Sequence, residues 1–392
     1  MSTNKQMLLM FLLCVASVIL PAHAAGNKMV KPVASEAASV QINGLLALLA
    51  QQPQLVSGNV GDQTPSGLPR LYGVTARGVK RNATAAQAQA LVESYERDAK
   101  LGNVAALWSF AKCHEVGLGV KQDYAMALNW YRKAADKGDA ESMSQIGYLY
   151  EVGQGVVKNM DEAFLWYRKA ALLGHANAQH NLAWGYKEGH GTAQDSVQAA
   201  EWFEKSAQQG DPDGQYQLAL AYLGGSGVAQ NDETAVMWLR KAAAQHQADA
   251  QNLLGEMMLQ GRAGLQANEA EVLALFQEAA ATNNAGAMFH LGEMREAGRA
   301  VEKNVPEAIY WYARAADYGS IPAQMRMAEL YAEGEVMPKS LEETARLYRK
   351  AAMNGNAGAQ SRLGMMLKNG EGVAKNEEEA QEWLDKAAKQ TQ

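Results

Sequence analysis

The chain has 392 residues, of which 48% are apolar and 20% are charged, and its formal net charge is −6. This composition excludes a disordered low-complexity chain and a collagen-like fibre. With 36 Lys and Arg against 42 Asp and Glu, it also excludes a strongly basic nucleic-acid-binding protein. Length alone predicts two or three domains, unless the sequence contains a regular repeat.

The first 24 residues are typical of a secretory signal peptide. Lys5 precedes an almost unbroken apolar run over 7–20, and a small-x-small cleavage motif ends at Ala24. A membrane-spanning helix needs roughly 20 apolar residues, and this run stops short of that at Pro21. We therefore predict cleavage after Ala24, no membrane anchor in the mature chain, and a periplasmic or secreted location.

Residues 25–84 differ in character from the rest of the chain. They contain four Pro and a Gly/Ser/Thr/Asn-rich centre, with six Lys and Arg against two Asp and Glu. No helical period is sustained over this segment, which predicts a flexible basic leader. The leader precedes an acidic body, so contact with that body or with an anionic surface is an alternative to a solvated linker.

A unit of about 36 residues then recurs eight times. A Lys-Ala-Ala-like triplet marks each unit, and the steps between successive triplets are all 36 or 37 residues. Such a constant spacing predicts a stack of supersecondary units. A capping helix is predicted over 85–102. The solenoid is predicted over 103–392, with units at 103–138, 139–174, 175–210, 211–246, 247–283, 284–319, 320–355 and 356–392.

Each unit contains the signals of two helices. The first helix has a small residue that permits close helix approach, and a Gly-x-Gly turn follows it in five units, as a helix C-cap and tight turn require. The second helix begins at a strong N-cap type, and Glu or Gln follows three residues later in six units. The predicted N-caps are Asp123, Asn159, Asp195, Asn231, Asn268, Asn304, Ser340 and Asn376. A large apolar residue in that helix, usually Trp, is predicted to pack against small Ala positions.

The combined pattern resembles the Sel-one-like repeat, a relative of the tetratricopeptide repeat. Residues 140–171 show it, with a small residue after Ile146, the turn Gly153-Gln-Gly155-Val, and the ending Trp-Tyr-Arg-Lys-Ala-Ala. The resemblance covers residues 103–391 and implies an all-α fold, a right-handed superhelical α/α solenoid. It also implies an adaptor, because exported bacterial members resemble envelope regulators, assembly scaffolds or binders of host proteins. One cysteine-rich branch is linked to penicillin binding, but this chain lacks its paired cysteines.

The sequence offers few candidates for catalysis or cofactor binding. The Gly-x-Gly turns recur in several units without a preceding strand, so they do not indicate a dinucleotide site. Ser109 and Lys112 match Ser-x-x-Lys, yet the companion motifs of penicillin-recognising enzymes are missing downstream. His175, His180 and His190 are spaced too irregularly for one helical face. We predict no catalytic residue, no metal site and no cofactor.

Cys113 is the one cysteine beyond the signal peptide, since Cys14 lies within it. No disulfide framework is therefore predicted. Cys113 falls at a position that is small or apolar in every unit, which predicts a buried thiol rather than a redox site.

Two positions of the first helix vary between units and define the candidate binding site. In the tetratricopeptide relatives these positions line a concave groove, and the resemblance implies the same here. An aromatic patch is expected at Tyr148, His180, Trp184, Tyr216 and Leu220, and an acidic ladder at Glu256, Glu293 and Glu329. Such a surface suits a basic, partly apolar segment of a partner, or the chain's own leader at 70–81. The alternative is that some of these rings only fill the seam between repeats.

We therefore predict an exported, non-enzymatic scaffold or regulator that binds a partner protein or peptide in the concave groove, in a bacterial cell envelope. A secreted or surface-exposed binder of host proteins is the alternative. A penicillin-recognising or peptidoglycan-acting hydrolase is a third possibility. The sequence predicts neither a nucleic-acid partner nor an oligomeric state.

Overall fold

A computed structural model describes residues 85–266 and 268–390 of the chain. The signal peptide and the basic leader predicted from the sequence lie outside these residues. The described part contains 17 α-helices, one short 3₁₀ turn (η1, Arg262–Gly264) and no strand. No helix within it has the length and apolar character needed to cross a membrane.

The helices follow one another in pairs behind a single leading helix, α4 (Ala85–Lys100). We call the first helix of each pair the A helix, the second the B helix, and number the pairs as repeats 1 to 8. The A helices are α5 (Val104–Val116), α7 (Ala140–Val152), α9 (Ala176–Glu188), α11 (Pro212–Gly224), α13 (Ala248–Leu259), α15 (Ala285–Ala297), α17 (Ile321–Glu333) and α19 (Ala357–Asn369). The B helices are α6 (Tyr124–Ala135), α8 (Met160–Leu172), α10 (Ser196–Gln208), α12 (Asp232–Ala243), α14 (Glu269–Ala281), α16 (Val305–Asp317), α18 (Leu341–Met353) and α20 (Glu377–Gln390).

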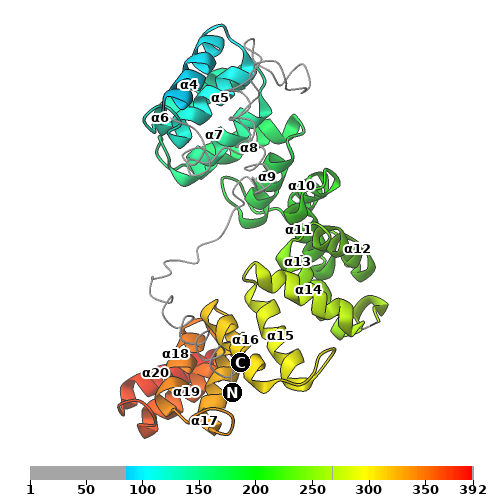
Figure 1. Ribbon diagram of the computed structural model, residues 1–392, viewed down its shortest axis with the longest axis vertical. Coiled ribbons are helices and arrows are strands. Elements are labelled where there is room, and N and C mark those ends of the chain that lie inside the picture. Colours follow the sequence, from blue (N-terminus) through cyan, green and yellow to red (C-terminus); the bar gives the residue numbers. More distant parts are fainter. Residues whose placement is uncertain (1–84, 267, 391–392) are drawn as a thin grey trace, which may run out of the picture.

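Each helix packs mainly against the helices directly before and after it in the chain. The pairs therefore stack in order, from α4 at one end of the long molecule to α20 at the other (Figure 1). This nearest-neighbour arrangement is that of a solenoid. The predicted all-α fold of stacked helical pairs is confirmed.

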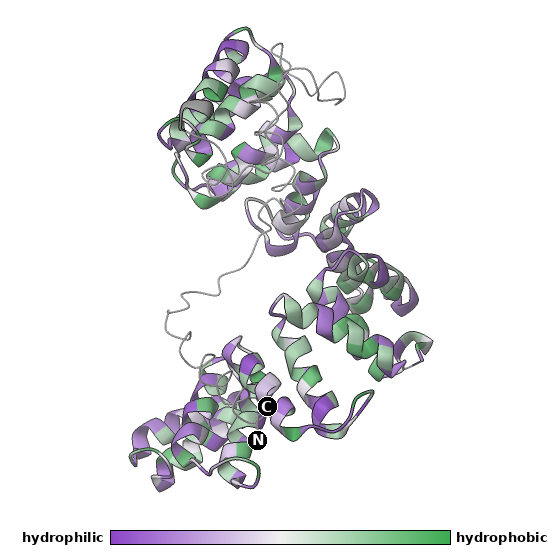
Figure 2. Cartoon of the chain, viewed as in Figure 1, coloured by the Kyte–Doolittle hydropathy of each residue, from purple (hydrophilic) through white to green (hydrophobic). Residues whose placement is uncertain are grey.

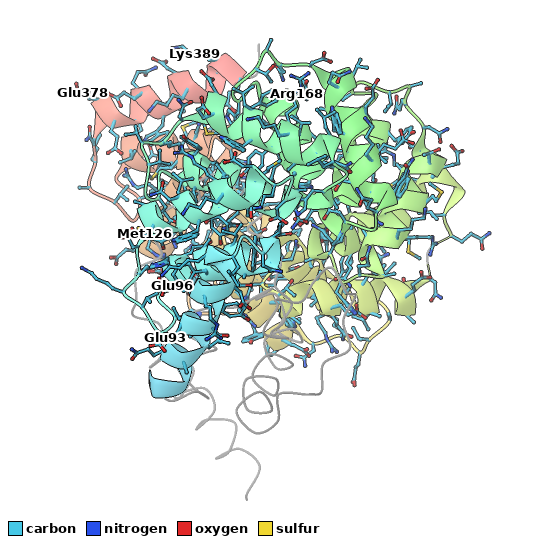
Figure 3. All side chains as sticks on the ribbon, turned by 90° about the horizontal axis from the view of Figure 1, so that it is seen from above. Glu93, Glu96, Met126, Arg168, Glu378 and Lys389 are labelled. Carbon is cyan, nitrogen blue, oxygen red and sulfur yellow. The ribbon has the colours of Figure 1, made fainter. Side chains whose placement is uncertain are left out.

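Side chains alternate in polarity along each helix of the stack. Figure 2 shows polar and apolar segments on the same helices, as expected when one face packs against neighbours and the other faces water. Seen along the long axis, the labelled charged side chains lie at the periphery (Figure 3). They come from α4 (Glu93 and Glu96), α8 (Arg168) and α20 (Glu378 and Lys389).

The predicted N-caps of the B helices are confirmed. The Asp123 carboxylate accepts a hydrogen bond from the Met126 N–H at 2.9 Å, and the Asn376 side chain accepts one from the Glu379 N–H at 3.1 Å. The six predicted caps between these two make the same kind of bond. Each cap satisfies a backbone donor that the first helical turn leaves without a partner.

The Gly-x-Gly turns have two structural roles. The first Gly takes a left-handed conformation and ends the A helix, as at Gly153 with φ +76. The second Gly lies against the preceding repeat: a Cβ on Gly155 would come within 2.4 Å of the Tyr124 carbonyl carbon. Repeat 5 departs from the pattern, because α13 ends at Leu259 with Gln260 as a right-handed C-cap, and η1 follows.

Buried small and aromatic residues form the core between the helices. Cys113 is fully buried, which confirms the predicted buried thiol, and burial raises its pKa. In the B helices, Trp202 and Trp238 are buried, and the other Trp residues of this row are half-buried. In five repeats a Lys three residues later lies over the Trp ring, as with Lys133 at 3.5 Å from the Trp130 centroid.

A buried Gln ties successive repeats together at five places. Its Nε2 donates to the carbonyl of the alanine that ends the Lys-Ala-Ala-like triplet of the preceding B helix, at 3.1–3.3 Å. The five residues are Gln179, Gln215, Gln251, Gln324 and Gln360. Each of these carbonyls also accepts a hydrogen bond from the backbone N–H three residues later, so the Gln side chain adds a second donor and links the A helix to the preceding B helix.

Candidate partner-binding face

The A-helix face is the surface formed by the two variable positions of each A helix. Its aromatic half spans repeats 2 to 4, where Tyr148, Trp184 and Tyr216 pack against the core and are partly exposed. Leu220 is also partly exposed. The three rings therefore combine contact with the core and access to solvent.

His180 differs, and its predicted place on the exposed surface is wrong. The residue is only 2% exposed. Its Nδ1 lies 3.0 Å from a carboxylate oxygen of Asp211, the N-cap of the next A helix, and its ring packs edge-on against Phe203. His180 therefore stabilises the seam between repeats 3 and 4.

Asp211 is the centre of this seam contact. It also accepts hydrogen bonds from the Ser206 hydroxyl at 2.7 Å and the Gly214 N–H at 2.8 Å. Burial by itself raises the pKa of Asp211, but these bonds and the His180 contact outweigh burial and lower it. A charged Asp211 thus stays hydrogen-bonded inside the stack.

Trp184 and Tyr216 are held in fixed positions on the face. Trp184 lies 6.1 Å from the Phe203 ring, and Lys187 Nζ lies 4.2 Å from the Trp184 centroid. Burial, together with the nearby charges of Asp249 and Glu256, raises the pKa of Tyr216 to about 12. Tyr216 therefore remains a neutral hydroxyl at physiological pH, able to donate or accept a hydrogen bond.

Glu256 and Glu293, from the predicted acidic ladder, flank one histidine. His290 Nε2 lies 3.0 Å from Glu256 Oε1, and Nδ1 lies 2.8 Å from Glu293 Oε2. Burial lowers the pKa of His290, but the bonds to the two carboxylates outweigh burial and raise it to about 9. The imidazole is thus a cation at neutral pH, stacked on Phe276 at 4.8 Å.

Glu329 belongs to a second mixed group. It lies 3.6 Å from Arg326, which also pairs with Glu296 of the preceding A helix. Glu296 accepts a 2.6 Å hydrogen bond from the Tyr312 hydroxyl. The predicted acidic ladder is therefore a row of carboxylates with cations between them.

His290, Arg326 and Glu296 also contribute to this face and were not predicted from the sequence. His290 and Glu293, and likewise Arg326 and Glu329, are three residues apart on one helix, a spacing that predicts contact from the sequence. The contacts of these residues with neighbouring repeats could not be predicted from such a spacing.

The Ser-x-x-Lys match has no accessible nucleophile. Ser109 is fully buried, and Lys112 Nζ pairs with Glu115 at 2.6 Å. Two of the three histidines considered for metal binding have separate carboxylate partners: His175 bonds to Glu141, and His180 bonds to Asp211. In the described ranges, no group of three or more His, Cys, Asp or Glu is placed to hold a metal ion.

Comparison with known families agrees with this architecture. The family described as "Sel1 repeat" matches eight consecutive segments, at residues 104–139, 140–175, 176–211, 212–246, 248–284, 285–320, 321–356 and 357–391. The chain belongs to the Sel1 repeat family. Members of this family are generally protein-interaction scaffolds.

Two solved structures resemble this Sel1 repeat protein over most of its length. One is c5321, described as a protective antigen present in uropathogenic Escherichia coli strains displaying an SLR fold. It is 30% identical, with 81% of this chain and 80% of that chain covered and a TM-score of 0.57. The other is a Sel1 repeat protein from Oxalobacter formigenes, also 30% identical, with 77% and 88% covered and a TM-score of 0.57. No curated protein matches the sequence.

Proposed function

We propose that this Sel1 repeat protein is an exported, non-catalytic scaffold or regulator that binds a partner protein or peptide on its A-helix face, in a bacterial cell envelope. One observation carries the proposal: partly exposed rings in repeats 2 to 4 continue into partly exposed carboxylates in repeats 5 to 7 on the same row of helices. Trp and Tyr side chains are enriched in the hot spots of protein-binding surfaces.

The rings on this face are held in place before any partner arrives. Tyr148, Trp184 and Tyr216 each pack against the core on one side. A side chain that is already ordered loses little conformational entropy on binding, so such rings are efficient anchors.

The charges on the same face favour a basic partner segment. The Glu293 and Glu329 side chains are 50% and 39% exposed, and among the described residues each forms one salt bridge. Four carboxylates, at Glu256, Glu293, Glu296 and Glu329, stand against the two cations His290 and Arg326, which leaves a net charge of about −2. The partner we propose is a basic, partly apolar segment, either of another protein or of this chain at 70–81.

Site-specific photo-cross-linking in cells of the source organism tests the proposal. A photoreactive amino acid replaces Tyr148 or Glu293 on A helices. The matched controls replace Leu165 or Met237 on B helices, which are 46% and 43% exposed, and the Glu293 side chain is 50% exposed. We expect one protein to be captured from both A-helix positions and from neither B-helix position. Equal capture from both sets would contradict an A-helix site.

The proposed export has a separate test. N-terminal sequencing of the protein isolated from those cells should begin at Ala25. A chain that retains its first residues would contradict the proposed cleavage, without affecting the A-helix face.

A further inference from the structure

A tyrosine–glutamate pair recurs between the A and B helices of three repeats. The B-helix hydroxyl donates to the A-helix carboxylate at 2.6 Å in each, and the pairs are Tyr131–Glu115, Tyr167–Glu151 and Tyr312–Glu296. Repeat 3 has Phe203 and Lys187 at these two positions. It therefore lacks both the hydroxyl and the carboxylate, and presents a cation where the other three repeats have an anion.

A pocket of about 100 Å³ lies at this place, between α9, α10 and α11, which follow one another in the stack (Figure 1). Phe203 and Leu220 supply apolar lining, and Ser196 and Ser226 supply hydroxyls. Phe203 is only 2% exposed, so its ring is a fixed part of the core. The pocket is smaller than the roughly 300–1,000 Å³ that drug-sized ligands occupy, so it suits one small group.

Lys187 and Gln217 lie on the polar side of the pocket, with the two serines. Lys187 Nζ donates to Gln217 Oε1 at 2.9 Å. Because an ammonium group can only donate, the amide oxygen of Gln217 must face it, which turns Nε2 away as a further donor. None of the described residues accepts a hydrogen bond from this Nε2.

Lys187 also has no anionic partner among the residues that the structure describes. No carboxylate of the described residues forms a salt bridge with its ammonium group, which lies over the Trp184 ring instead. Lys187 is half-buried, and this partial desolvation lowers its pKa because it disfavours the charged form. A bound anion would offset that effect.

We infer that this pocket binds a small aliphatic carboxylate, with its oxygens on Lys187 Nζ and Gln217 Nε2 and its alkyl part against Phe203 and Leu220. The bound carboxylate takes the electrostatic role that glutamate has in the repeats with a Tyr–Glu pair. Two sources share this chemistry: a free short-chain acid and the C-terminal residue of a peptide. The inference is independent of the proposed scaffold function, because a free acid suffices to test it.

Isothermal titration calorimetry on the full chain tests the site with two matched probe pairs. One pair is butyrate and butyramide. The other is the peptide N-acetyl-Ala-Ala-Val as its free acid and as its C-terminal amide. We expect at least one acid to bind at least tenfold more tightly than its amide. Tighter binding of butyrate identifies a free-acid site, and tighter binding of the peptide acid identifies a C-terminus site.

Three variants locate the binding. Lys187→Met keeps the apolar stem and removes the charge, and we expect at least a tenfold loss of affinity. Lys205→Met is the matched control, since Lys205 lies over Trp202 at 3.6 Å on the B helix of the same repeat, and we expect no change. The double variant Lys187→Glu with Phe203→Tyr installs the pair of the other repeats and should abolish binding in a folded protein.

Two results would overturn the inference. One is that neither acid binds more tightly than its amide. The other is that Lys187→Met or the folded double variant binds the acid as tightly as the parent. Because the double variant recreates a pair already present in three repeats, it keeps the test decisive if Lys187→Met does not fold.

Discussion

Replacing Tyr312 by Phe isolates the contribution of one tyrosine–glutamate pair. Tyr312 is 1% exposed, and its hydroxyl donates to Glu296 Oε2 at 2.6 Å. Phe keeps the ring, so no cavity forms. A hydrogen bond to a charged group contributes about 1.5–3 kcal/mol. Because Glu296 keeps Arg326 as a partner, we expect a loss of about 2 kcal/mol in the free energy of unfolding of repeat 6, within that range.

Tyr348→Phe is the matched control. Tyr348 occupies the same position in repeat 7 and is 3% exposed, but its hydroxyl bonds to none of the described residues. The position that holds Glu296 in repeat 6 is Ala332 in repeat 7. We expect this substitution to change stability by less than about 0.5 kcal/mol, as for changes that remove no specific contact.

Native-state hydrogen exchange of the α15 and α16 amides is the appropriate assay. A solenoid of nearest-neighbour contacts reports a local change locally, and its global unfolding need not be a two-state transition. A loss of about 2 kcal/mol corresponds to exchange about 30-fold faster at these amides. If Tyr312→Phe accelerates exchange no more than Tyr348→Phe does in its own repeat, the hydroxyl–carboxylate bond adds nothing beyond solvation, and the reasoning is refuted.

Three further predictions concern other parts of the stack. The pKa of His290 is raised to about 9, so its ion pairs stabilise the fold fully below about pH 6.5 and lose effect as pH rises through 9. At low pH these ion pairs add at most about 3 kcal/mol to the free energy of unfolding. The melting temperature of His290→Gln should therefore lie below that of the parent at pH 6 and approach it at pH 10, and a difference that stays constant with pH would contradict this. Gly155→Ala adds backbone contact at 2.4 Å to left-handed strain, whereas Gly174→Ala adds strain only. In urea titrations Gly155→Ala should cost about 1–3 kcal/mol more, and equal losses would argue against the close approach. Cys113, fully buried and with a raised pKa, should react with a thiol reagent only as fast as the fold opens, and rapid reaction without denaturant would disprove its burial.

Local signals explain how much of the fold was predictable. Each B helix begins at its predicted cap because Asp, Asn and Ser bond to a backbone N–H only three residues away. The left-handed glycines ended seven A helices for an equally local reason. The burial of Cys113 followed from its position in the period.

The candidate site was less predictable, because its contacts join different repeats. The prediction for His180 failed because its partner, Asp211, lies 31 residues away, and the prediction for Glu256 omitted His290, 34 residues away. Lys187 was missed because its unusual character depends on Phe203 and Gln217, which lie on two other helices.

The sequence by itself determined the number of repeats, the ends of their helices and the family, because these depend on short-range bonds and on a constant period. The period predicts that residues about 36 apart in the sequence occupy equivalent positions in successive repeats. It does not predict which non-equivalent positions are in contact, and three contacts between repeats join residues 30, 31 and 34 apart. The offset and angle between successive A helices determine those separations. Only the tertiary structure therefore decided which charges on the A-helix face are paired, and that Lys187 forms no salt bridge with any of the described residues.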